Sequence, residues 1–534
     1  MYASIGFITP FLVAVAFFIP LLTLLTKKKA IFDSLMITAA FIAMVLTWYN
    51  YFLVKSIGEP IVYTFGGWPP PIGIVYEVDE LSAVLAVVTS TIMFLVGLYS
   101  IWYLKGTKGF EWFYTLYLGL EAGMVGCIYT GDAFNLFVML EVMSVSAYAL
   151  VAFYRSSKEA VEASIKYAII GAVSTTIYFI ALMFIYGAFG TLNMAELAAR
   201  VRSLTSYPLF TGGFLTPPPA NISLAASIAL ALSLWAFTFK AAVFPNHFWL
   251  PDAHPAAPTP VSAILSGLVV NVGAYAIIRF FYTILGWDSM KSISSAVSSA
   301  AAILVVLGGA SALIASALML VQKDIKRLIA YSTILHLGLI VSAASLGTNT
   351  GLAGSMYHIV THAVGKALLF LTAGVVIKMV GSRSIDDIAG VARRAPLTIF
   401  AMVVAVFSLV GIPPFGGFFS KLVLYQAFIT SPHVYMVAVL LISSALALLA
   451  YTKILYVAWF RHPIREFRVE RESPLSTATL ITMALILVLL GILSPIIYDS
   501  VFMSAAYSVT NYLSYINSAH NALASYLTSL VGGG

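Results

Sequence analysis

The chain is poor in cysteine: Cys127 is the single cysteine among 534 residues. One thiol excludes a disulfide framework, and it cannot hold an iron–sulfur cluster, which needs about four thiolates. The sequence also lacks any GxxxxGK[ST] or GxGxxG stretch, so it gives no sign of a nucleotide site. Any electron carrier that works with this chain must therefore sit on another chain.

Charged residues are scarce as well. They make up 9% of the chain, against 61% hydrophobic residues, and the mean hydropathy is +0.98. Such a composition cannot be wrapped around one soluble core. Apolar stretches of roughly 20 residues recur along the sequence, each long enough to cross a hydrocarbon layer about 30 Å thick. We therefore predict an all-α polytopic membrane protein with about 14 transmembrane helices.

Basic residues are concentrated in alternate loops between these stretches. The positive-inside rule explains the formal net charge of +7 better than nucleic-acid binding does. The basic loops, predicted to face the cytoplasm, carry Lys27, Lys28, Lys29, Lys105, Lys108, Arg155, Lys158, Lys323, Lys326, Arg327, Arg383, Arg393, Arg394, Arg461, Arg465, Arg468 and Arg471. The opposite loops carry Glu59, Glu77, Asp79, Glu80 and the prolines at 217–219. We expect a multi-pass protein of the cell membrane with both termini outside.

The whole chain, 1–534, is predicted to be one membrane domain, because no connection is long enough for a soluble domain. Its expected parts are helices 1–3 in 1–109, a first repeat of helices 4–8 in 110–285, a second repeat of helices 9–13 in 297–460, and C-terminal helices in 474–534. A shift of 191 residues places Ser164–Ala198 on Ser355–Ala389. Because the offset is five spans, an odd number, the two repeats should cross the membrane in opposite senses.

The two ends of the chain raise separate questions. The first apolar stretch ends at Lys27 and lacks the basic start and cleavage site of a signal peptide, so we expect it to be a retained span. The tail at 504–530 is rich in Ser, Asn and Tyr with scattered apolar residues. It is predicted to be either a weak last span or a helix lying in the membrane interface.

Two long spans, expected to be helices 7 and 12, should be broken inside the membrane. The run Ala395–Thr430 is interrupted by GIPPFGG, and a similar interruption lies in Phe239–Pro255. Proline removes a backbone donor and clashes with the preceding turn. Unwound backbone survives at membrane depth only where protein or a water-filled cavity satisfies it. Paired broken helices in inverted repeats indicate a transport site near the bilayer midplane.

Four charged residues lie within apolar stretches, where an ionisable group is costly and indicates function. They are Glu141, Lys240, Lys366 and Lys421. Structural alternatives exist for three of them. The Glu141 carboxylate could be satisfied by a nearby serine, Lys240 could extend to the membrane interface, and Lys421 could cap loose carbonyls at the break.

His358, His362 and Lys366 are spaced i, i+4 and i+8, which places all three on one face of a helix. Such a row can pass protons from group to group. Two histidines four residues apart can also bind zinc, but HIVTH lacks the glutamate of HExxH and has no third ligand nearby. We therefore predict no metal site, and a packed, hydrogen-bonded histidine face is the structural alternative.

Several motifs together identify a family resemblance. GDAFNLFVMLEVMSVSAYALVAF, FKAAVFPNHFWLPDAHPAAPTPVSAILSG, DIKRLIAYSTILHLGLI, HIVTHAVGKALLFLTAGVVI and GIPPFGGFFSKLVLYQAF occur in that order. They strongly resemble the antiporter-like membrane subunits shared by respiratory complex I, Mrp-type cation/proton antiporters and membrane-bound hydrogenases. The resemblance runs from about Gly66 to Phe460. GGWPPPIGI, at Gly66–Ile74, looks most like the Mrp and membrane-bound hydrogenase branch.

The resemblance implies a hydrated polar axis along the middle of the membrane. Glu141 and Lys240 match an ion pair, Lys366 matches the central lysine, and Lys421 matches the residue facing the exit side. The proton-translocating residues implied in this way are Glu141, Lys240, His358, His362, Lys366 and Lys421. Residues that could serve proton entry or relay are His247, Asp252, His254, Asn271 and His336.

Asn271 departs from the family pattern, because relatives carry a lysine or a nearby histidine in this span. An asparagine forms hydrogen bonds but cannot carry a proton charge at neutral pH. Three hypotheses follow. Ordered water bridges Lys240 and His358, the chain is a duplicated copy with impaired pumping, or the site serves another ion.

The sequence therefore favours a proton- or Na+-translocating subunit of a multisubunit membrane oxidoreductase or Mrp-type antiporter complex. The expected partners are other membrane subunits and the lipid membrane. The expected ion is H+, with Na+ as the alternative, and we expect no nucleic acid to bind. We expect no cofactor in this chain, with any iron–sulfur or nickel–iron centre on partner subunits, including a peripheral redox arm. The chain itself would be a non-catalytic translocating subunit of that oxidoreductase. A stand-alone transporter of a small solute and a structural spacer are the alternatives.

Overall fold

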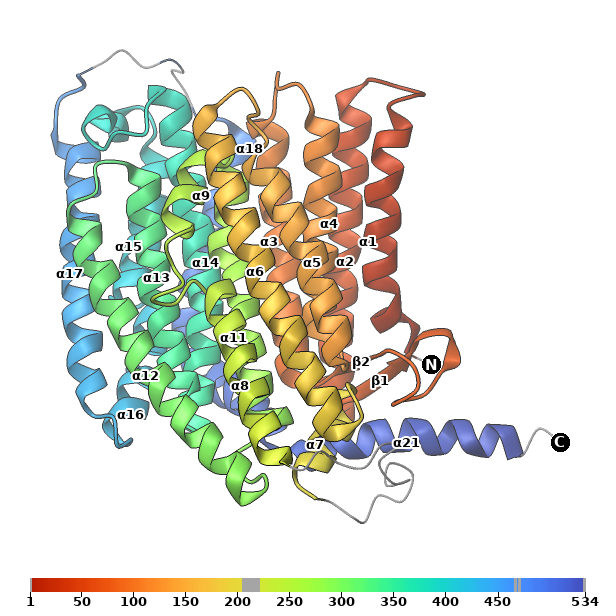
Figure 1. Ribbon diagram of the computed structural model, residues 1–534. Helices are drawn as coiled ribbons and strands as arrows, with labels where there is room; N and C mark the ends of the chain where they lie inside the picture. The colour runs from red at the N-terminus through yellow and green to blue at the C-terminus, as the bar shows by residue number, and fades with distance from the viewer. Residues whose placement is uncertain (1, 204–220, 465–467, 469–471, 532–534) are drawn as a thin grey trace.

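The computed structural model describes residues 2–203, 221–464, 468 and 472–531. The prolines at 217–219, together with Arg465 and Arg471, lie outside these described residues. Figure 1 shows a bundle of long helices with a small β-hairpin at one end and a last helix lying across that same end. The predicted polytopic helical fold is confirmed.

The elements follow the chain in four groups. The first comprises α1 (Ala3–Leu22), α2 (Lys29–Ile57), β1 (Ile61–Thr64), β2 (Val75–Val78) and α3 (Glu80–Tyr103). The second comprises α4 (Phe110–Tyr129), α5 (Ala133–Val151), α6 (Lys158–Phe189), α7 (Met194–Val201), α8 (Ile222–Lys240), α9 (Leu250–Ala256), α10 (Thr259–Ile264), the π-helical η2 (Leu265–Val269), α11 (Val270–Ile278) and the π-helical η3 (Arg279–Ile284).

The third group comprises α12 (Lys291–Leu320), α13 (Ile325–Ala344), α14 (Asn349–Val380), α15 (Pro396–Val410), α16 (Gly416–Ile429) and α17 (Tyr435–Phe460). The last comprises α18 (Pro474–Ile492), α19 (Ser494–Ile497), the π-helical η6 (Tyr498–Met503), α20 (Ser504–Thr510) and α21 (Tyr512–Val531). The strands pair antiparallel with Ile61 opposite Val78.

Among the described residues, 12 helices are long and apolar enough to cross a membrane, or up to 13 if a bent pair that includes α15 counts as one span. The sequence estimate of about 14 also included α4. This helix lies within the bundle, packed between α1 and α5, but Glu111 and Glu121 lower its hydropathy. The two counts therefore differ because the sequence estimate includes α4, whereas its two carboxylates keep it out of the count of apolar helices.

Helices α6 and α14 correspond at the predicted shift of 191 residues. Each is 32 residues long and ends at a glycine with positive φ, Gly190 for α6 and Gly381 for α14. Glu159, at the start of α6, pairs with Arg383, which follows the end of α14. The start of one helix therefore meets the end of the other, so the two run in opposite senses. The limits of the two repeats remain a prediction.

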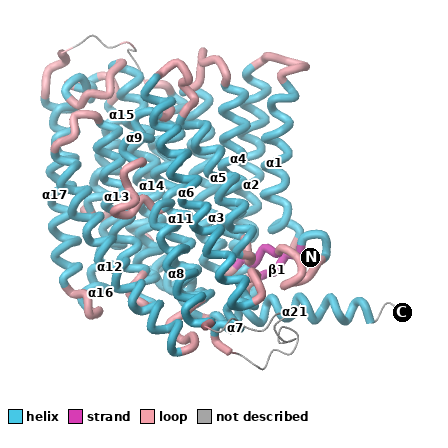
Figure 2. The backbone as a smooth tube through the Cα atoms, viewed as in Figure 1, coloured by secondary structure: helices cyan, strands magenta, loops and turns pink. Residues whose placement is uncertain are grey.

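Both predicted breaks are present. Helix α8 ends at Lys240 and α9 begins at Leu250, while α15 ends at Val410 and α16 begins at Gly416. Figure 2 shows a loop at mid-height of the bundle as well as loops at its ends. Side chains satisfy some of the freed backbone groups: Ser311 Oγ accepts a hydrogen bond of 2.7 Å from the Phe244 amide. Protein atoms thus replace water at these unwound segments.

The two ends of the bundle differ in charge. One end, the hairpin face, carries β1, β2, α7 and α21; the other, the basic face, carries the loops at 23–28, 104–109, 152–157 and 381–395 (Figure 1). The start of α1 and the end of α21 both lie at the hairpin face. One residue assigned to the basic loops is misplaced: Lys326 is only 3% exposed and lies inside the protein.

The tail resolves into two parts. Helix α20 packs against α3 and α14, whereas α21 lies flat across the hairpin face, where it contacts α7 and β1 (Figure 1). Of the two predicted alternatives, the interfacial helix describes α21. An amphipathic helix in this position covers polar groups at the end of the bundle while its other side remains exposed.

Close packing at the second break yields a first prediction. A Cβ added at Gly417 would overlap the carbonyl oxygen of Ser408, whereas nothing lies within 4 Å of a Cβ added at Gly187 in α6. We expect Gly417→Ala to separate α15 from α16 and to cost about 1 to 3 kcal/mol. The thermal unfolding midpoint of the purified protein should fall for Gly417→Ala and stay near wild type for Gly187→Ala. Equal midpoints would show that the break is loosely packed.

Candidate functional site

Lys240 is buried and points into the protein. Its side chain is 3% exposed, and its ammonium donates a hydrogen bond of 2.6 Å to Ser144 Oγ on α5. Glu141, one turn earlier on α5, acts on Lys240 electrostatically, but no ion pair within 4 Å joins them among the described residues. Ser144, rather than Glu141, is therefore the direct partner of the Lys240 ammonium. Extension of Lys240 to the membrane interface, the structural alternative, is wrong.

Lys366 lies in the middle of α14 and is completely buried. Its ammonium donates to Ser332 Oγ on α13, to the Tyr451 hydroxyl at 3.2 Å on α17, and at 3.4 Å to the carbonyl of Ile329. All three partners are neutral oxygens. A charged ammonium held only by neutral groups is costly at membrane depth, so a modest change of surroundings suffices for it to give up its proton.

The histidines form a continuous contact from α13 to α16. His336 Nδ1 lies 3.0 Å from His358 Nε2, and His358 Nδ1 lies 2.9 Å from Ser420 Oγ. Ser420 also lies 3.1 Å from the hydroxyl of Thr361. The sequence-predicted face of α14 is thus joined to the start of α16, where Ser420 directly precedes Lys421.

Lys421 ends this row at the second break. Its ammonium donates to the carbonyl of Val410, the last residue of α15, at 2.9 Å and to Ser444 Oγ at 2.8 Å. Lys421 therefore does cap a loose carbonyl, as the structural alternative had it. Since its side chain is only 6% exposed, the residue is both a cap and a buried cation.

His362 and Asn271 carry buried polar atoms with no hydrogen-bond partner in the described structure. These atoms are both ring nitrogens of His362 and Oδ1 of Asn271. The His362 ring lies 5.4 Å from that of His336, centroid to centroid, and Asn271 Nδ2 donates at 2.6 Å to the carbonyl of Gly267 in η2. Buried polar atoms without protein partners are typical places for ordered water.

A small cavity lies beside Asn271. Its volume is about 10 Å³, and Asn271 and Tyr275 line it from α11 while Ile359 and Ala363 line it from α14. Ile359 follows His358, and Ala363 follows His362. A cavity needs about 10 to 15 Å³ of this kind of volume to hold one water. The space therefore fits a single water beside Asn271, where α11 meets α14 and Thr89 of α3.

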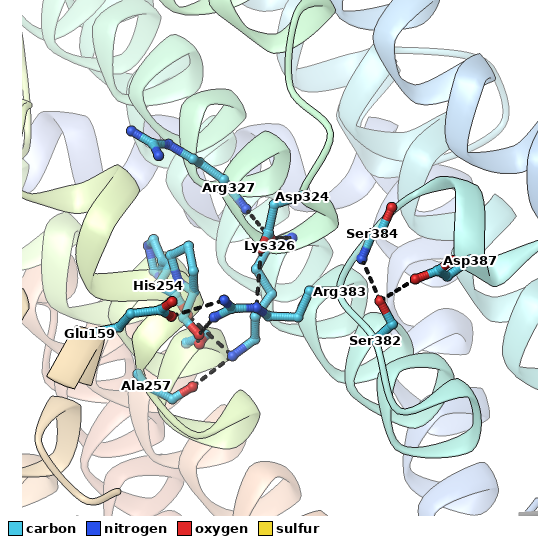
Figure 3. A network of polar contacts seen from close by, with 12 residues as sticks. Glu159, His254, Ala257, Asp324, Lys326, Arg327, Ser382, Arg383, Ser384 and Asp387 are labelled. Carbon is cyan, nitrogen blue, oxygen red and sulfur yellow. Dashed lines mark hydrogen bonds and ion pairs between the residues drawn. The ribbon is translucent and has the colours of Figure 1, made fainter. Parts of the chain in front are cut away.

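A charged cleft opens at the basic face. Its volume is about 260 Å³, and the charged residues that line it are Glu159, Glu162, Lys166, Asp252, Asp324, Arg327 and Arg383. Figure 3 shows Arg383 between Glu159 and Asp324, and these ion pairs measure 3.1 Å and 3.2 Å. Asp252 contacts Lys166 at 3.5 Å and Arg327 at 3.4 Å. Asp252, a sequence candidate for proton entry, is therefore at an aqueous opening.

His254, its companion in the sequence motif, lies beneath the cleft rather than in a turn. It is fully buried in α9, its ring stacks on Phe370 with centroids 4.7 Å apart, and neither ring nitrogen has a described hydrogen-bond partner. Phe370 follows Lys366 by one helical turn, so His254 lies between the cleft and the central lysine. Lys326 donates to the carbonyls of His254 and Ala257 (Figure 3).

His247 is the candidate that the structure does not bring into the row. It lies in the first break, next to the 52% exposed Phe248, and its ring packs near that of Phe244. Among the described residues, no group of three or more His, Cys, Asp or Glu side chains is placed to hold a metal ion.

Sequence reasoning missed the hydroxyl partners. Ser332 precedes His336 by four residues on α13, the same spacing that revealed the row on α14, so this signal was available. Ser420 adjoins Lys421. Tyr451 carries no local signal, because only the packing of α17 against α13 brings it to Lys366.

Comparison with known proteins decides the family. Residues 130–447 match the family model described as NADH:quinone oxidoreductase/Mrp antiporter, TM, which covers more than half of the chain. The chain belongs to this family. Residues 70–114 also match the model described as NADH-Ubiquinone oxidoreductase (complex I), chain 5 N-terminus. The resemblance that the motifs indicated is thereby confirmed.

Two curated members of the NADH:quinone oxidoreductase/Mrp antiporter family illustrate its range. NADH-quinone oxidoreductase subunit N of Desulforudis audaxviator is 34% identical over 420 residues, which is 78% of this chain and 79% of the relative. A Na(+)/H(+) antiporter subunit of Alkalihalophilus pseudofirmus is 30% identical over 399 residues, 74% of this chain and 76% of the relative.

Solved structures agree with this assignment. A chain of the membrane-bound sulfane sulfur reductase, an archaeal respiratory membrane complex, superposes with a TM-score of 0.87 at 29% identity, covering 97% of this chain and 100% of that one. A chain of the Mrp complex from Dietzia sp. gives 0.84 at 25%, with the same coverage. Respiratory complex I from Thermus thermophilus shares the fold, with a TM-score of 0.71 at 23% identity and coverage of 92% and 98%.

The bond from Lys366 to Ser332 yields a second prediction. Ser332→Ala leaves the buried ammonium with Tyr451 and one long carbonyl contact, so we expect a loss of about 1 to 3 kcal/mol. Ser345→Ala is the matched control, because Ser345, which directly follows α13, is also buried but donates only to the carbonyl of Val341 in that helix. Thermal unfolding of the purified protein should separate the two variants. Identical midpoints would mean that Ser332 does not hold Lys366.

Proposed function

We propose that this chain is an ion-translocating subunit of a multisubunit membrane complex and that it moves protons along its buried polar row. The observation that carries the proposal is the burial of three lysines, Lys240, Lys366 and Lys421, each bonded only to neutral oxygens. A buried charge that serves stability alone is ordinarily paired with an opposite charge. Lysines kept this way are suited to accept and release protons.

The histidines connect these lysines. A proton that leaves the Lys366 side of the row meets His362, His336 and His358 within ring-to-ring contact, and then Ser420 beside Lys421. Each of these groups can give and accept a proton. We place a relaying water in the cavity at Asn271, with further water leading toward Lys240 and the histidines. The unpartnered Oδ1 of Asn271 beside that cavity supports this bridging-water hypothesis over loss of pumping.

Glu141 supplies the switch in this proposal. Its carboxylate favours the protonated form of Lys240, and their present separation leaves Ser144 as the direct partner. Movement of the carboxylate away from the ammonium would weaken that preference and release the proton toward the row. The same movement, driven from a neighbouring subunit, would couple this chain to its complex.

The charged cleft is the proposed entry. It opens at the surface and its charged lining favours water, and His254 lies between it and Lys366. We assign the basic face to the cytoplasm because of the positive-inside rule, which places the hairpin face and both termini outside. Protons are the proposed ion, with Na+ as the alternative cation at the acidic residues of the cleft.

The relatives support a multisubunit setting. Their names describe subunits of an antiporter and of an NADH-quinone oxidoreductase, and the solved structures are complexes. We propose that membrane subunits flank this chain and that any iron–sulfur or nickel–iron centre lies on a peripheral redox arm. Native purification followed by identification of every chain and metal tests this. A chain that purifies alone and binds a small solute would contradict it.

Replacement of the central lysine yields a third prediction. Lys366→Met removes the ammonium but keeps the length of the side chain, so we expect the complex to lose proton transport by about tenfold or more. Lys378→Met is the control on the same helix, because Lys378 lies at the basic end and donates to the Tyr103 carbonyl. The readout is the pH gradient formed or collapsed by the complex in inside-out vesicles. Full transport by Lys366→Met would contradict the proposal.

The hypotheses for Asn271 make different predictions. If the side chain holds a relaying water, Asn271→Leu, which is similar in size but apolar, should lower transport by about tenfold, and Asn271→Lys should preserve it. If the copy pumps poorly because of Asn271, then Asn271→Leu should change nothing and Asn271→Lys should raise transport. If the site serves Na+, only the Na+-dependent part of the transport should fall in Asn271→Leu. The same vesicle measurement, with and without Na+, separates the three.

A further inference from the structure

Glu77 is a buried carboxylate that the row described above does not use. It lies on β2, its side chain is 0% exposed, and neither carboxylate oxygen has a hydrogen-bond partner among the described residues. The backbone of Gly131 closes one side, because a Cβ there would come within 3.2 Å of Glu77 Oε2. A carboxylate left without donors in a closed site is rarely tolerated for structural reasons alone.

The neighbouring charges are already balanced without Glu77. Asp79 lies two residues after Glu77 and on the same side of the chain. Both of its carboxylate oxygens accept hydrogen bonds from Arg279, at 2.5 Å and 2.7 Å, which makes a buried ion pair. Arg279 lies between the rings of Tyr275 and Tyr515, 5.3 Å from each ring centroid. An ionised Glu77 would therefore add one uncompensated negative charge to a closed, neutral cluster.

The environment of Glu77 accordingly favours its protonated form. Burial raises the pKa of Glu77 well above its ordinary value; Arg279 opposes that shift, Asp79 reinforces it, and the Tyr515 hydroxyl opposes it. For Asp79, burial acts in the same upward direction, but the ion pair and hydrogen bonds with Arg279 outweigh it and hold the pKa below its usual range. The pKa values of the two carboxyl groups are thus shifted in opposite directions, because only Asp79 has a cation as a direct partner.

Hydroxyl groups connect this cluster with the cavity at Asn271. Tyr275 lines that cavity, and its hydroxyl accepts a hydrogen bond of 3.0 Å from Arg279 Nε and lies 3.4 Å from Ser82 Oγ. Ser82 Oγ in turn donates at 2.9 Å to Asp79. Polar groups therefore extend from the middle of α11 to the carboxyl cluster at the hairpin face.

Helix α21 covers the outer end of this path. Its Tyr515 is 1% exposed, and its hydroxyl faces Glu77 closely enough to lower the pKa of that carboxyl. The helix lies across the hairpin face, and its far end is exposed (Figure 1). A displacement of α21 that withdraws Tyr515 from Arg279 would open the carboxyl cluster to water at the hairpin face.

We propose that Glu77 is a proton-binding site that links the Asn271 cavity to the hairpin face, with α21 as its cover. The Glu77 carboxyl gives its proton to water at the hairpin face and is left as a carboxylate. A proton carried by cavity water then passes to the Tyr275 hydroxyl, which turns from the Ile128 carbonyl toward Ser82, and from Ser82 to Asp79, its hydrogen-bond acceptor. Each hydroxyl passes on one proton and receives another, and the Asp79 carboxyl gives the proton to Glu77 and returns to its ion pair with Arg279. This inference rests on the proposed proton transport and adds a second exchange point to it.

The test compares two substitutions in the assembled complex. Glu77→Gln keeps the size and neutrality of the side chain but cannot release a proton, whereas Glu77→Asp keeps a carboxyl group. Glu80→Gln is the matched control, because Glu80 lies on the same face but pairs with Lys55 at 2.9 Å. Two measurements are made: proton transport in inside-out vesicles, and the infrared carbonyl band of protonated carboxyl groups as a function of pH.

We expect Glu77→Gln to lower transport by about tenfold or more and to remove one protonated-carboxyl band at neutral pH, with Glu77→Asp and Glu80→Gln retaining most of the transport. Wild-type transport and an unchanged band in Glu77→Gln would overturn the inference, as would equal losses in Glu77→Gln and Glu77→Asp. Lys366→Met is measured in parallel. If it abolishes transport while Glu77→Gln does not, the Glu77 site alone fails; if it leaves transport intact, the proposed function fails.

Discussion

The structure depends on holding cationic lysines inside a membrane without neutralising them. A buried ion costs several kcal/mol unless polar groups surround it, and a carboxylate partner would fix its proton. The fold meets both conditions by placing hydroxyls of Ser144, Ser332, Tyr451 and Ser444 against the three ammonium groups. These bonds stabilise the cations only partly, which leaves their protonation responsive to nearby charge.

The broken helices follow from the same constraint. A lysine near the end of a half-helix lies beside loose backbone carbonyls, and these oxygens solvate an ammonium without carrying a full charge. Lys240 ends α8, and Lys421 reaches the last carbonyl of α15. The long unbroken α14 packs against both halves of the second break, α15 and α16, and carries His358 and His362. The unwound segments therefore supply part of the solvation of the buried lysines. Close contacts such as that at Gly417 hold the half-helices in place.

Much of this arrangement was predictable from local patterns. Proline and glycine revealed both breaks, and the i, i+4, i+8 spacing placed His358, His362 and Lys366 on one face, as α14 shows. Partners supplied by other helices were not predictable, because nothing near Lys366 in sequence points to Tyr451. Lys326 was misplaced for a related reason: a lysine beside a loop is ordinarily solvated, but here two carbonyls of the neighbouring α9 segment bind it inside the protein.

The central claim is that protons cross the gap between Lys240 and the histidine row by way of water at Asn271. A structure of the native complex at a resolution that shows ordered water tests it most directly. The account predicts a water within hydrogen-bond distance of Asn271 Oδ1, and further water that reaches His362. A dry, apolar contact between α11 and α14 at this point would contradict it.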